Sequence, residues 1–173
     1  MKLNVFYLTD LLAPYRIEWM NEISKYNNVD AFYVYEDEKT RNHSWLKSVT
    51  PKFNCEKIIR FGIGKLSIPV GLLSKIKKNN YDLYIVDGYS SLLKLIVILF
   101  LNSKNKKTII NIDGFDLGKR NGFLFKAKFK VKQYVFKRNK YYICGSKNAA
   151  NEIIKNGAKL DNVCVHSLTS VYD

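Results

Sequence analysis

Short apolar segments alternate with helical segments along the whole chain, and this alternation constrains the fold most strongly. Apolar runs predict strands over residues 2–8, 29–35, 56–60, 82–87, 107–112, 141–144 and 163–165. Helical patterns lie between them, over residues 15–26, 68–78, 90–101, 123–137 and 146–155. The strands are apolar throughout rather than alternately polar, as is typical of strands covered on both faces. The order therefore predicts a doubly wound α/β fold with a mostly parallel sheet.

Residues that start or end helices support these boundaries. Pro14 lies just inside the first helix, where its missing N–H has no helical partner, and Gly157 closes the last one. Residues 36–50 are polar and predict a loop. The sequence contains no internal repeat, low-complexity tract or linker. We therefore expect residues 1–173 to form one domain.

Composition excludes several other classes of protein. Of the 173 residues, 47% are hydrophobic and 25% charged, a balance that excludes collagen-like and wholly disordered chains. Cys55, Cys144 and Cys164 are far apart and form no Cys/His cluster, so we expect no metal site and a reducing cytoplasm. The most apolar stretch, residues 92–101, is interrupted by Lys94 and is shorter than the roughly 20 residues of a membrane span. The N-terminus has no signal-peptide pattern, so we expect a soluble or peripheral protein.

Common nucleotide and catalytic motifs are missing from the sequence. No G-x-G-x-x-G follows the first strand, and there is no Walker lysine loop and no G-x-S-x-G elbow. His43 and His166 have no neighbouring Cys or Ser partner, which favours surface or turn positions. The sequence therefore predicts neither a dinucleotide or P-loop site nor a bound cofactor.

The fold class itself places the candidate ligand-binding residues. In open α/β sheets, ligands bind at the carboxyl ends of the strands. The residues that follow the predicted strands are Thr9, Asp10, Gly88, Tyr89, Asp113, Gly114, Gly145 and Ser146. These positions are candidates and do not by themselves indicate a function.

The net charge points to an anionic partner. Lys plus Arg is 29 and Asp plus Glu is 15, which gives +14. AT-rich coding, which also enriches Asn, Ile and Tyr, accounts for part of the overall charge but not for its placement. From Lys119 to Lys140 there are nine basic residues and no acidic one. This basic segment is the most uneven part of the charge distribution.

A helical wheel of the basic segment has two apolar arcs. We expect the first, which holds Phe123, Leu124, Ala127, Val131, Tyr134 and Val135, to face the core. The second holds three phenylalanines between lysines, a pattern that suits a membrane interface. The residues predicted to meet lipid are Phe125, Lys126, Lys128, Phe129, Lys130, Lys132 and Phe136.

Other interpretations of the basic segment stay open. The charges can form a solvated face while the second phenylalanine arc packs under a neighbouring element. Nucleic acid is a further partner class, although no known reader motif accompanies the basic residues. The strict alternation of residues 126–132 also fits a strand, but the flanking residues favour a helix.

Several segments, in their order and spacing, resemble family 4 glycosyltransferases of bacterial polysaccharide synthesis. The similarity spans nearly the whole chain. The segments are L-A-P-Y-R-I-E-W-M-N-E-I at 12–23, E-D-E-K-T-R-N-H-S-W at 36–45, Y-D-L-Y-I-V-D-G-Y at 81–89, K-T-I-I-N-I-D-G-F at 107–115, the run from Phe136 to Ala158, and V-H-S-L-T-S-V-Y-D at 165–173. Phe115 replaces the second glycine of the family's D-G-G turn.

The resemblance implies a GT-B architecture of two Rossmann-like domains and a retaining sugar transfer. In that architecture the N-terminal domain holds the acceptor and the C-terminal domain holds the nucleotide-sugar. The family's E-x7-E donor motif is not in this sequence, so the chain is expected to be an acceptor half that is inactive alone. Its expected partners are a glycan acceptor, often lipid-linked, an anionic membrane surface at the inner face of the plasma membrane, and a donor domain or partner chain. Nucleic acid is not expected.

The resemblance also assigns roles to residues at the predicted strand ends. Asp113 occupies the position where many relatives have a histidine near the transferred sugar, so it is the candidate catalytic residue; a plain Asp-Gly turn is the alternative. Arg16 would pair with an acceptor phosphate, or with Glu36 or Asp37. The other expected acceptor-binding residues are Tyr15, Asp10, Gly88, Tyr89 and Gly114. A second function class stays open: a non-catalytic, membrane-anchoring subunit of a split GT-B enzyme.

Overall fold

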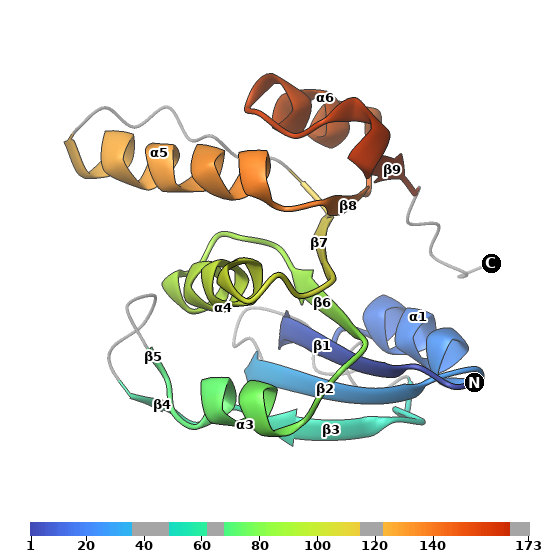
Figure 1. Cartoon of the computed structure of the whole chain (residues 1–173). Coiled ribbons are helices and arrows are strands. Elements are labelled where there is room, and N and C mark those ends of the chain that lie inside the picture. The colour runs from blue at the N-terminus through green and yellow to red at the C-terminus, as the bar shows by residue number, and fades with distance from the viewer. Residues whose placement is uncertain (36–48, 62–67, 115–122, 167–173) are drawn as a thin grey trace.

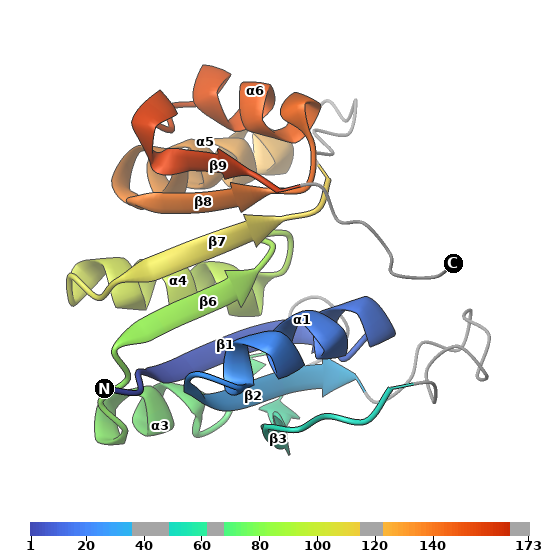
Figure 2. The ribbon, with the colours of Figure 1, turned by 90° about the vertical axis from the view of Figure 1, so that its right-hand side faces the viewer.

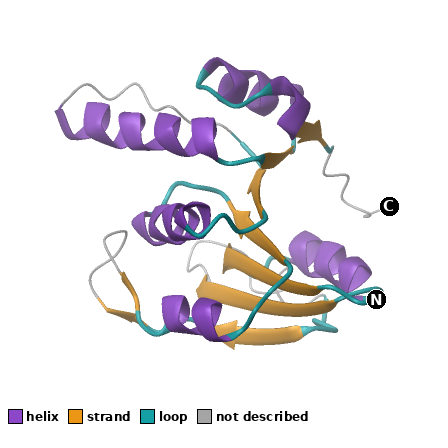
Figure 3. Cartoon of the chain, viewed as in Figure 1, coloured by secondary structure: helices purple, strands orange, loops and turns teal. Residues whose placement is uncertain are grey.

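The structure, a computed structural model, describes residues 1–35, 49–61, 68–114 and 123–166. Its strands are β1 (Asn4–Leu11), β2 (Asn28–Tyr35), β3 (Asn54–Lys57), β4 (Arg60–Phe61), β5 (Ile68–Pro69), β6 (Leu83–Asp87), β7 (Thr108–Ile112), β8 (Tyr141–Cys144) and β9 (Val163–Val165). Its helices are α1 (Pro14–Ser24), α3 (Leu72–Lys78), α4 (Leu92–Ser103), α5 (Phe123–Arg138), α6 (Lys147–Lys155) and the 3₁₀ turn η2 (Leu160–Asn162). Figures 1 and 3 show helices and strands alternating through the chain.

Seven strands form one parallel sheet in the order β3-β2-β1-β6-β7-β8-β9. Every neighbouring pair in this sheet is parallel. The chain winds outward from β1 to β3, returns to the middle, and winds outward again from β6 to β9 (Figure 2). The order reverses between β1 and β6. The predicted doubly wound, Rossmann-like α/β class is thereby confirmed.

Helices cover the two faces of the sheet unequally. The larger core lies between the sheet and α3, α4, α5 and α6, and it includes Phe6, Tyr84, Ile98 and Ile110. The smaller core lies on the opposite face, where α1 packs Met20 against the sheet. In Figure 2, α1 lies in front of β1 and β2, whereas α3 and α4 lie behind the sheet.

Local sequence explains where the helices begin and end. Pro14 occupies the first turn of α1, as predicted. The side chains of Ser91 and Ser146 accept hydrogen bonds from the backbone N–H three residues later, at the starts of α4 and α6. Gly157 follows α6 with a φ of 115°, a left-handed conformation that favours glycine.

The structure corrects the predicted face of α5. Phe136 is fully buried and packs edge-on against Tyr89, with ring centroids 5.0 Å apart. Val131 and Tyr134, which we expected in the core, are 38% and 48% exposed. Val135, which belongs to the same predicted arc as Tyr134, is fully buried as expected. The buried face of α5 therefore holds both Val135 and Phe136, whereas Val131 and Tyr134 face outward. The alternative in which the second phenylalanine arc packs under a neighbouring element is correct for Phe136.

Two other predictions of local structure have clear outcomes. The alternating residues 126–132 lie within α5, so the helix rather than the strand is correct. The helix expected from Ile68 is shorter, because Ile68 pairs with Phe61 in a small antiparallel ladder before α3 begins. Across the described residues, every helix is too short or too polar to cross a bilayer.

Candidate functional site

Polar side chains gather at the carboxyl ends of β1, β6 and β7, where the strand order reverses. Thr9 lies near the end of β1, Asp87 is the last residue of β6, and Asn111 and Asp113 flank the end of β7. Arg16 reaches the same place from the first turn of α1, which begins three residues after β1. This edge is where a doubly wound sheet binds ligands. We refer to Thr9, Arg16, Asp87, Asn111 and Asp113 as the strand-end network.

Asp87 is the centre of the strand-end network. Its side chain is 1% exposed. Its Oδ2 accepts hydrogen bonds from Thr9 Oγ1 at 2.9 Å and from Tyr7 Oη at 3.3 Å, and its Oδ1 accepts one from Asn111 Nδ2 at 2.9 Å. Arg16 Nε lies 2.7 Å from Oδ2 as an ion pair, although the N–H is not aligned for a hydrogen bond. A buried carboxylate needs such partners, because an unpaired charge in the interior is very costly.

Arg16 connects the buried Asp87 to the partly exposed Asp113. Its Nη2 lies 2.6 Å from Asp113 Oδ2, and its Nη1 donates to Thr9 Oγ1 at 3.1 Å. Tyr15 Oη donates to the same Asp113 oxygen at 3.2 Å. The side chain of Asp113 is 30% exposed, so it can still meet a ligand. Asp113, Arg16 and Tyr15, all predicted site residues, are thus brought together.

A second ion pair lies beside the strand-end network. Lys94 Nζ, on α4, is 2.6 Å from Asp10 Oδ2, and the Lys94 side chain is only 3% exposed. Gly88, which follows β6 with a φ of 80°, lies against this ammonium: a Cβ built on it would be 3.5 Å from Lys94 Nζ. A left-handed φ favours glycine, so the turn after β6 suits this residue. Predicted residues Asp10 and Gly88 therefore lie at one place.

Burial and nearby charges shift the pKa values of Asp87, Tyr15, Tyr7 and Arg16. Burial raises the pKa of Asp87, while the Arg16 guanidinium and Lys94 oppose that shift. Burial also raises the pKa of Tyr15 to about 12 and that of Tyr7 well above its ordinary value. The pKa of Arg16 is raised, because the attraction of the nearby anionic groups, Asp87 first, outweighs the cost of burying the cation. Both tyrosines are therefore hydrogen-bond donors at neutral pH.

The remaining predicted acceptor-binding residues have different surroundings. Gly114 is exposed and follows Asp113, and a Cβ on it would have no neighbour within 4 Å among the described residues. The ring of Tyr89 is buried against Phe136, and Lys132 Nζ lies 4.9 Å from its centroid. The Tyr89 ring is thus part of the core beside α5, and its role in acceptor binding stays a prediction. The suggested pairing of Arg16 with Glu36 or Asp37 involves residues outside the described ranges.

The predicted membrane-interface residues on α5 have mixed positions. Phe136 is in the core, which contradicts its assignment to a lipid surface. Phe129 and Lys132 are half-buried, and Lys130 is exposed. The side chains of Phe125, Lys126 and Lys128 lie outside the described part of the structure.

Sequence reasoning missed two charged residues of this edge, Asp87 and Lys94. Each left a signal. Asp87 ends the apolar run of the fourth predicted strand, and Lys94 interrupts the most apolar helix of the chain. Both are nearly fully buried, at 2% and 3% exposure. Burying a charged side chain is costly unless it has a partner of opposite charge. A charged residue within an apolar run therefore predicts an ion pair with a residue far away in the sequence.

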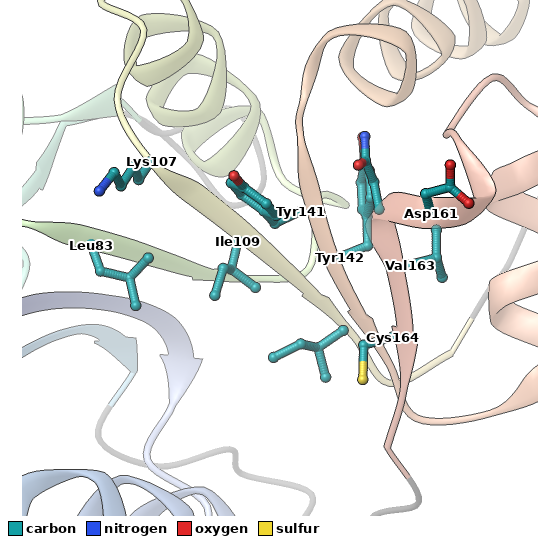
Figure 4. A pocket seen from close by; sticks show the side chains of 10 residues that line it. Leu83, Lys107, Ile109, Tyr141, Tyr142, Asp161, Val163 and Cys164 are labelled. Carbon is teal, nitrogen blue, oxygen red and sulfur yellow. The ribbon is translucent and has the colours of Figure 1, made fainter.

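Neither a metal centre nor the described pocket coincides with this edge. Among the described residues, no group of three His, Cys, Asp or Glu side chains is placed to hold a metal ion. A pocket of about 480 Å³ lies at the opposite, amino-terminal ends of β6 to β9 (Figure 4). It is lined by Leu83, Lys107, Ile109, Tyr141, Tyr142, Ile143, Asp161, Asn162, Val163 and Cys164.

Comparison with known proteins supports the fold assignment. No family model matches the chain, and no curated protein sequence matches it significantly. Among solved structures, Anabaena Alr3699/HepE in complex with UDP and glucose is similar, with a TM-score of 0.60 and 14% identity over 94% of this chain. A UDP-N-acetylglucosamine 2-epimerase (TM-score 0.59, 16% identity, 95% of this chain) and that of Rickettsia bellii (TM-score 0.58, 11% identity, 95% of this chain) are similar as well. The chain spans 43%, 48% and 44% of the lengths of these three structures.

Proposed function

We propose that this chain is the acceptor-binding half of a retaining glycosyltransferase that moves a sugar from a nucleotide-sugar to a glycan acceptor. The observation that carries the proposal is the strand-end network, where a partly exposed Asp113 is held by Arg16 and Tyr15. The similar structures support it, since one holds UDP and glucose and others are UDP-N-acetylglucosamine 2-epimerases. The chain itself spans less than half of each structure compared, so the nucleotide-sugar is assigned to a further domain or partner chain.

Asp113 is the catalytic residue of this proposal. Its Oδ2 is fixed by Arg16 Nη2 at 2.6 Å and by Tyr15 Oη at 3.2 Å, so the carboxylate is oriented before the acceptor arrives. A carboxylate at this position accepts a hydrogen bond from the attacking acceptor hydroxyl and places it. Positioning and electrostatic stabilisation then carry most of the rate enhancement. No cofactor or metal ion is assigned to this half.

The acceptor is proposed to be a lipid-linked intermediate of a bacterial capsular or exopolysaccharide, met at the inner face of the plasma membrane. The support is the outward face of α5, which differs from the face predicted from sequence. Lys130, Lys137 and Arg138 are exposed beside Val131 and Tyr134, and no acidic residue lies between Lys119 and Lys140. Basic side chains that flank exposed apolar ones suit an anionic lipid surface.

Membrane recruitment is tested with vesicles of phosphatidylglycerol and phosphatidylcholine at low salt. At about 1 kcal/mol per basic residue, the triple change Lys130→Gln, Lys137→Gln and Arg138→Gln should weaken binding about hundredfold. The control changes Lys2, Lys52 and Lys78, three exposed lysines next to β1, β3 and α3 at the other end of the sheet from α5, to Gln and should bind almost normally. Equal loss in both variants would show that overall charge, rather than this face, recruits the protein.

The transferase activity is tested in cells of the source organism. Membranes from a deletion strain receive radiolabelled nucleotide-sugars, and incorporation into lipid-linked glycan is measured after complementation. We expect the wild-type gene to restore incorporation and the Asp113→Asn gene to restore at most about a hundredth of it. Full activity of the Asp113→Asn gene would support the alternative, a non-catalytic membrane-anchoring subunit. Unchanged glycan in the deletion strain would contradict both.

A further inference from the structure

The charges at the strand ends are arranged with the cations inside and two of the carboxylates outside. The exposed fraction of the side chain is 3% for Lys94 and 17% for Arg16, but 30% for Asp113 and 38% for Asp10. A site that binds phosphate usually presents its cations or backbone N–H groups to the ligand. Here a ligand meets carboxylate oxygens first.

Each exposed carboxylate is fixed mainly through one of its two oxygens. Asp10 Oδ2 is held by Lys94 Nζ at 2.6 Å, and Asp113 Oδ2 by Arg16 Nη2 at 2.6 Å. Asp113 Oδ1 receives a long contact of 3.5 Å from Asn111 Nδ2. Within the described ranges, Asp10 Oδ1 has no hydrogen-bond partner. Both Oδ1 atoms are therefore oriented acceptors with capacity for a donor group of a ligand.

The described charged groups at this edge sum to a charge of opposite sign to that of the chain. The described charged groups here are Asp10, Asp87 and Asp113 against Arg16 and Lys94, which gives 2 − 3 = −1. The whole chain carries +14. An anionic group would be attracted to the protein generally but repelled at this edge, whereas hydroxyl donors lose nothing from the negative charge.

We propose that this edge binds an uncharged, hydroxyl-bearing sugar ring through Asp10 and Asp113 and excludes phosphate. The inference rests on the proposed function, because it names the part of the acceptor that this site takes. Lys94 and Asp87 are positioning residues: Lys94 orients Asp10, and Asp87 holds the Arg16 that orients Asp113. The phosphate groups of a lipid-linked acceptor then lie away from the ends of β1, β6 and β7. The expectation that Arg16 pairs with an acceptor phosphate is replaced by this arrangement.

The test is a titration of the ¹⁵N-labelled 173-residue chain, followed by the backbone amide signals of Gly88 and Gly114. The probes are methyl glycosides of glucose, galactose, mannose and rhamnose, with inorganic phosphate and glucose 1-phosphate as charged counterparts. We expect at least one glycoside to shift both glycine signals with a saturating curve. Inorganic phosphate should leave them unchanged, and glucose 1-phosphate should bind more weakly than methyl glucoside.

Variants separate binding through the carboxylates from a general effect on the fold. Asp10→Asn and Asp113→Asn should each weaken glycoside binding about tenfold, since each loses a hydrogen bond to a charged acceptor. The matched control Asp161→Asn changes an exposed carboxylate in η2, next to the amino-terminal end of β9, and this variant should bind the glycosides normally. Lys94→Met should weaken binding while the amide signals remain dispersed, and Lys94→Arg should restore part of the affinity. If Lys94→Met does not fold, the two Asn variants still decide the matter.

Two results would overturn the proposal. One is saturable binding of phosphate at Gly88 and Gly114, and the other is the absence of any glycoside response up to the solubility limit. Neither result depends on the deletion-strain assay. Glycan synthesis that requires Asp113, combined with phosphate binding at this edge, would refute this inference alone. Glycoside binding in a protein whose deletion leaves the glycan unchanged would refute the transferase and leave a sugar-binding site.

Discussion

At the scale of single residues, Asp87 determines how the strand-end network is arranged. Three hydrogen-bond donors and one cation surround a carboxylate that is almost completely buried. Desolvation of such a group is offset only when its partners are in place. Because one of them, Arg16, also holds Asp113, the buried charge sets the geometry of the exposed one. The buried Asp87 carboxylate therefore helps to orient Asp113 at the proposed site, through Arg16.

The first prediction concerns this buried pair. Asp87→Asn should lower the free energy of unfolding by about 3 kcal/mol, since it leaves the Arg16 guanidinium without its buried counter-charge. Urea unfolding followed by circular dichroism measures the change. Adding Arg16→Met to Asp87→Asn should cost less than the sum of the two single changes. Strict additivity of the two would show that the pair is not coupled.

The second prediction concerns Tyr15 and alkaline pH. Burial raises its pKa from 10.0 to about 12, so the folded chain keeps a proton that the unfolded chain loses in this range. Its contribution to stability is present below pH 10 and is lost as pH rises through about 12. The unfolding free energy of the wild type should fall more steeply between pH 10 and 12 than that of Tyr15→Phe. Parallel curves for the two proteins would contradict the raised pKa.

At the scale of elements, α5 shows where a sequence pattern fails. Its helical wheel carries two apolar arcs of similar strength, so periodicity alone does not identify the buried one. A contact with the turn between β6 and α4 decides the matter: Tyr89, in that turn, packs its ring against Phe136, with ring centroids 5.0 Å apart. This contact joins residues 47 positions apart, which a helical wheel does not include.

The third prediction tests the face of α5 directly. Phe136→Ala should destabilise the protein by about 3–5 kcal/mol, because it removes a fully buried ring. Tyr134→Ala should cost less than about 1 kcal/mol, since that ring is 48% exposed and contacts Arg138 on the surface. Thermal or urea unfolding of both variants gives the comparison. The reverse order of costs would restore the face predicted from sequence.

At the scale of the whole molecule, the three free thiols differ in solvent exposure because of their positions in the sheet. Cys144 is fully buried on β8, whereas Cys55 and Cys164 are exposed. Burial also raises the pKa of the Cys144 thiol to about 11, which further slows its reaction as a thiolate. Ellman's reagent at pH 8 should therefore modify two thiols in the native protein and three in denaturant. Rapid modification of Cys144 in the native state would contradict the sheet order around β8.

The whole fold was more predictable than the site. The alternation of apolar and helical segments is a local signal, and it predicted most strands and helices and the parallel class, with Pro14 and Gly157 at the expected ends. The strand expected over residues 56–60 is wrong in its bounds, because β3 covers Asn54–Lys57 and Arg60 belongs to the small ladder of β4 with β5. The strand-end rule correctly placed Asp113, Asp10 and Gly88 at one edge. The pairings there join distant residues, such as Arg16 with Asp113 and Asp10 with Lys94, 97 and 84 positions apart. These pairings depend on the tertiary structure, which the sequence pattern does not contain. For this reason the sequence analysis did not identify Asp87 and Lys94 as site residues.

We propose that this domain works as one half of a two-part enzyme. It spans 43–48% of the lengths of the structures it resembles, and its polar edge is proposed to hold an acceptor rather than a nucleotide. The most direct measurement is the native mass of the product in its own cells, detected with an antibody to this domain and followed by identification of co-purifying chains. We expect either a polypeptide of about twice 20.1 kDa or a stable complex with a nucleotide-sugar-binding chain. A lone 20.1 kDa protein with no such partner would contradict it.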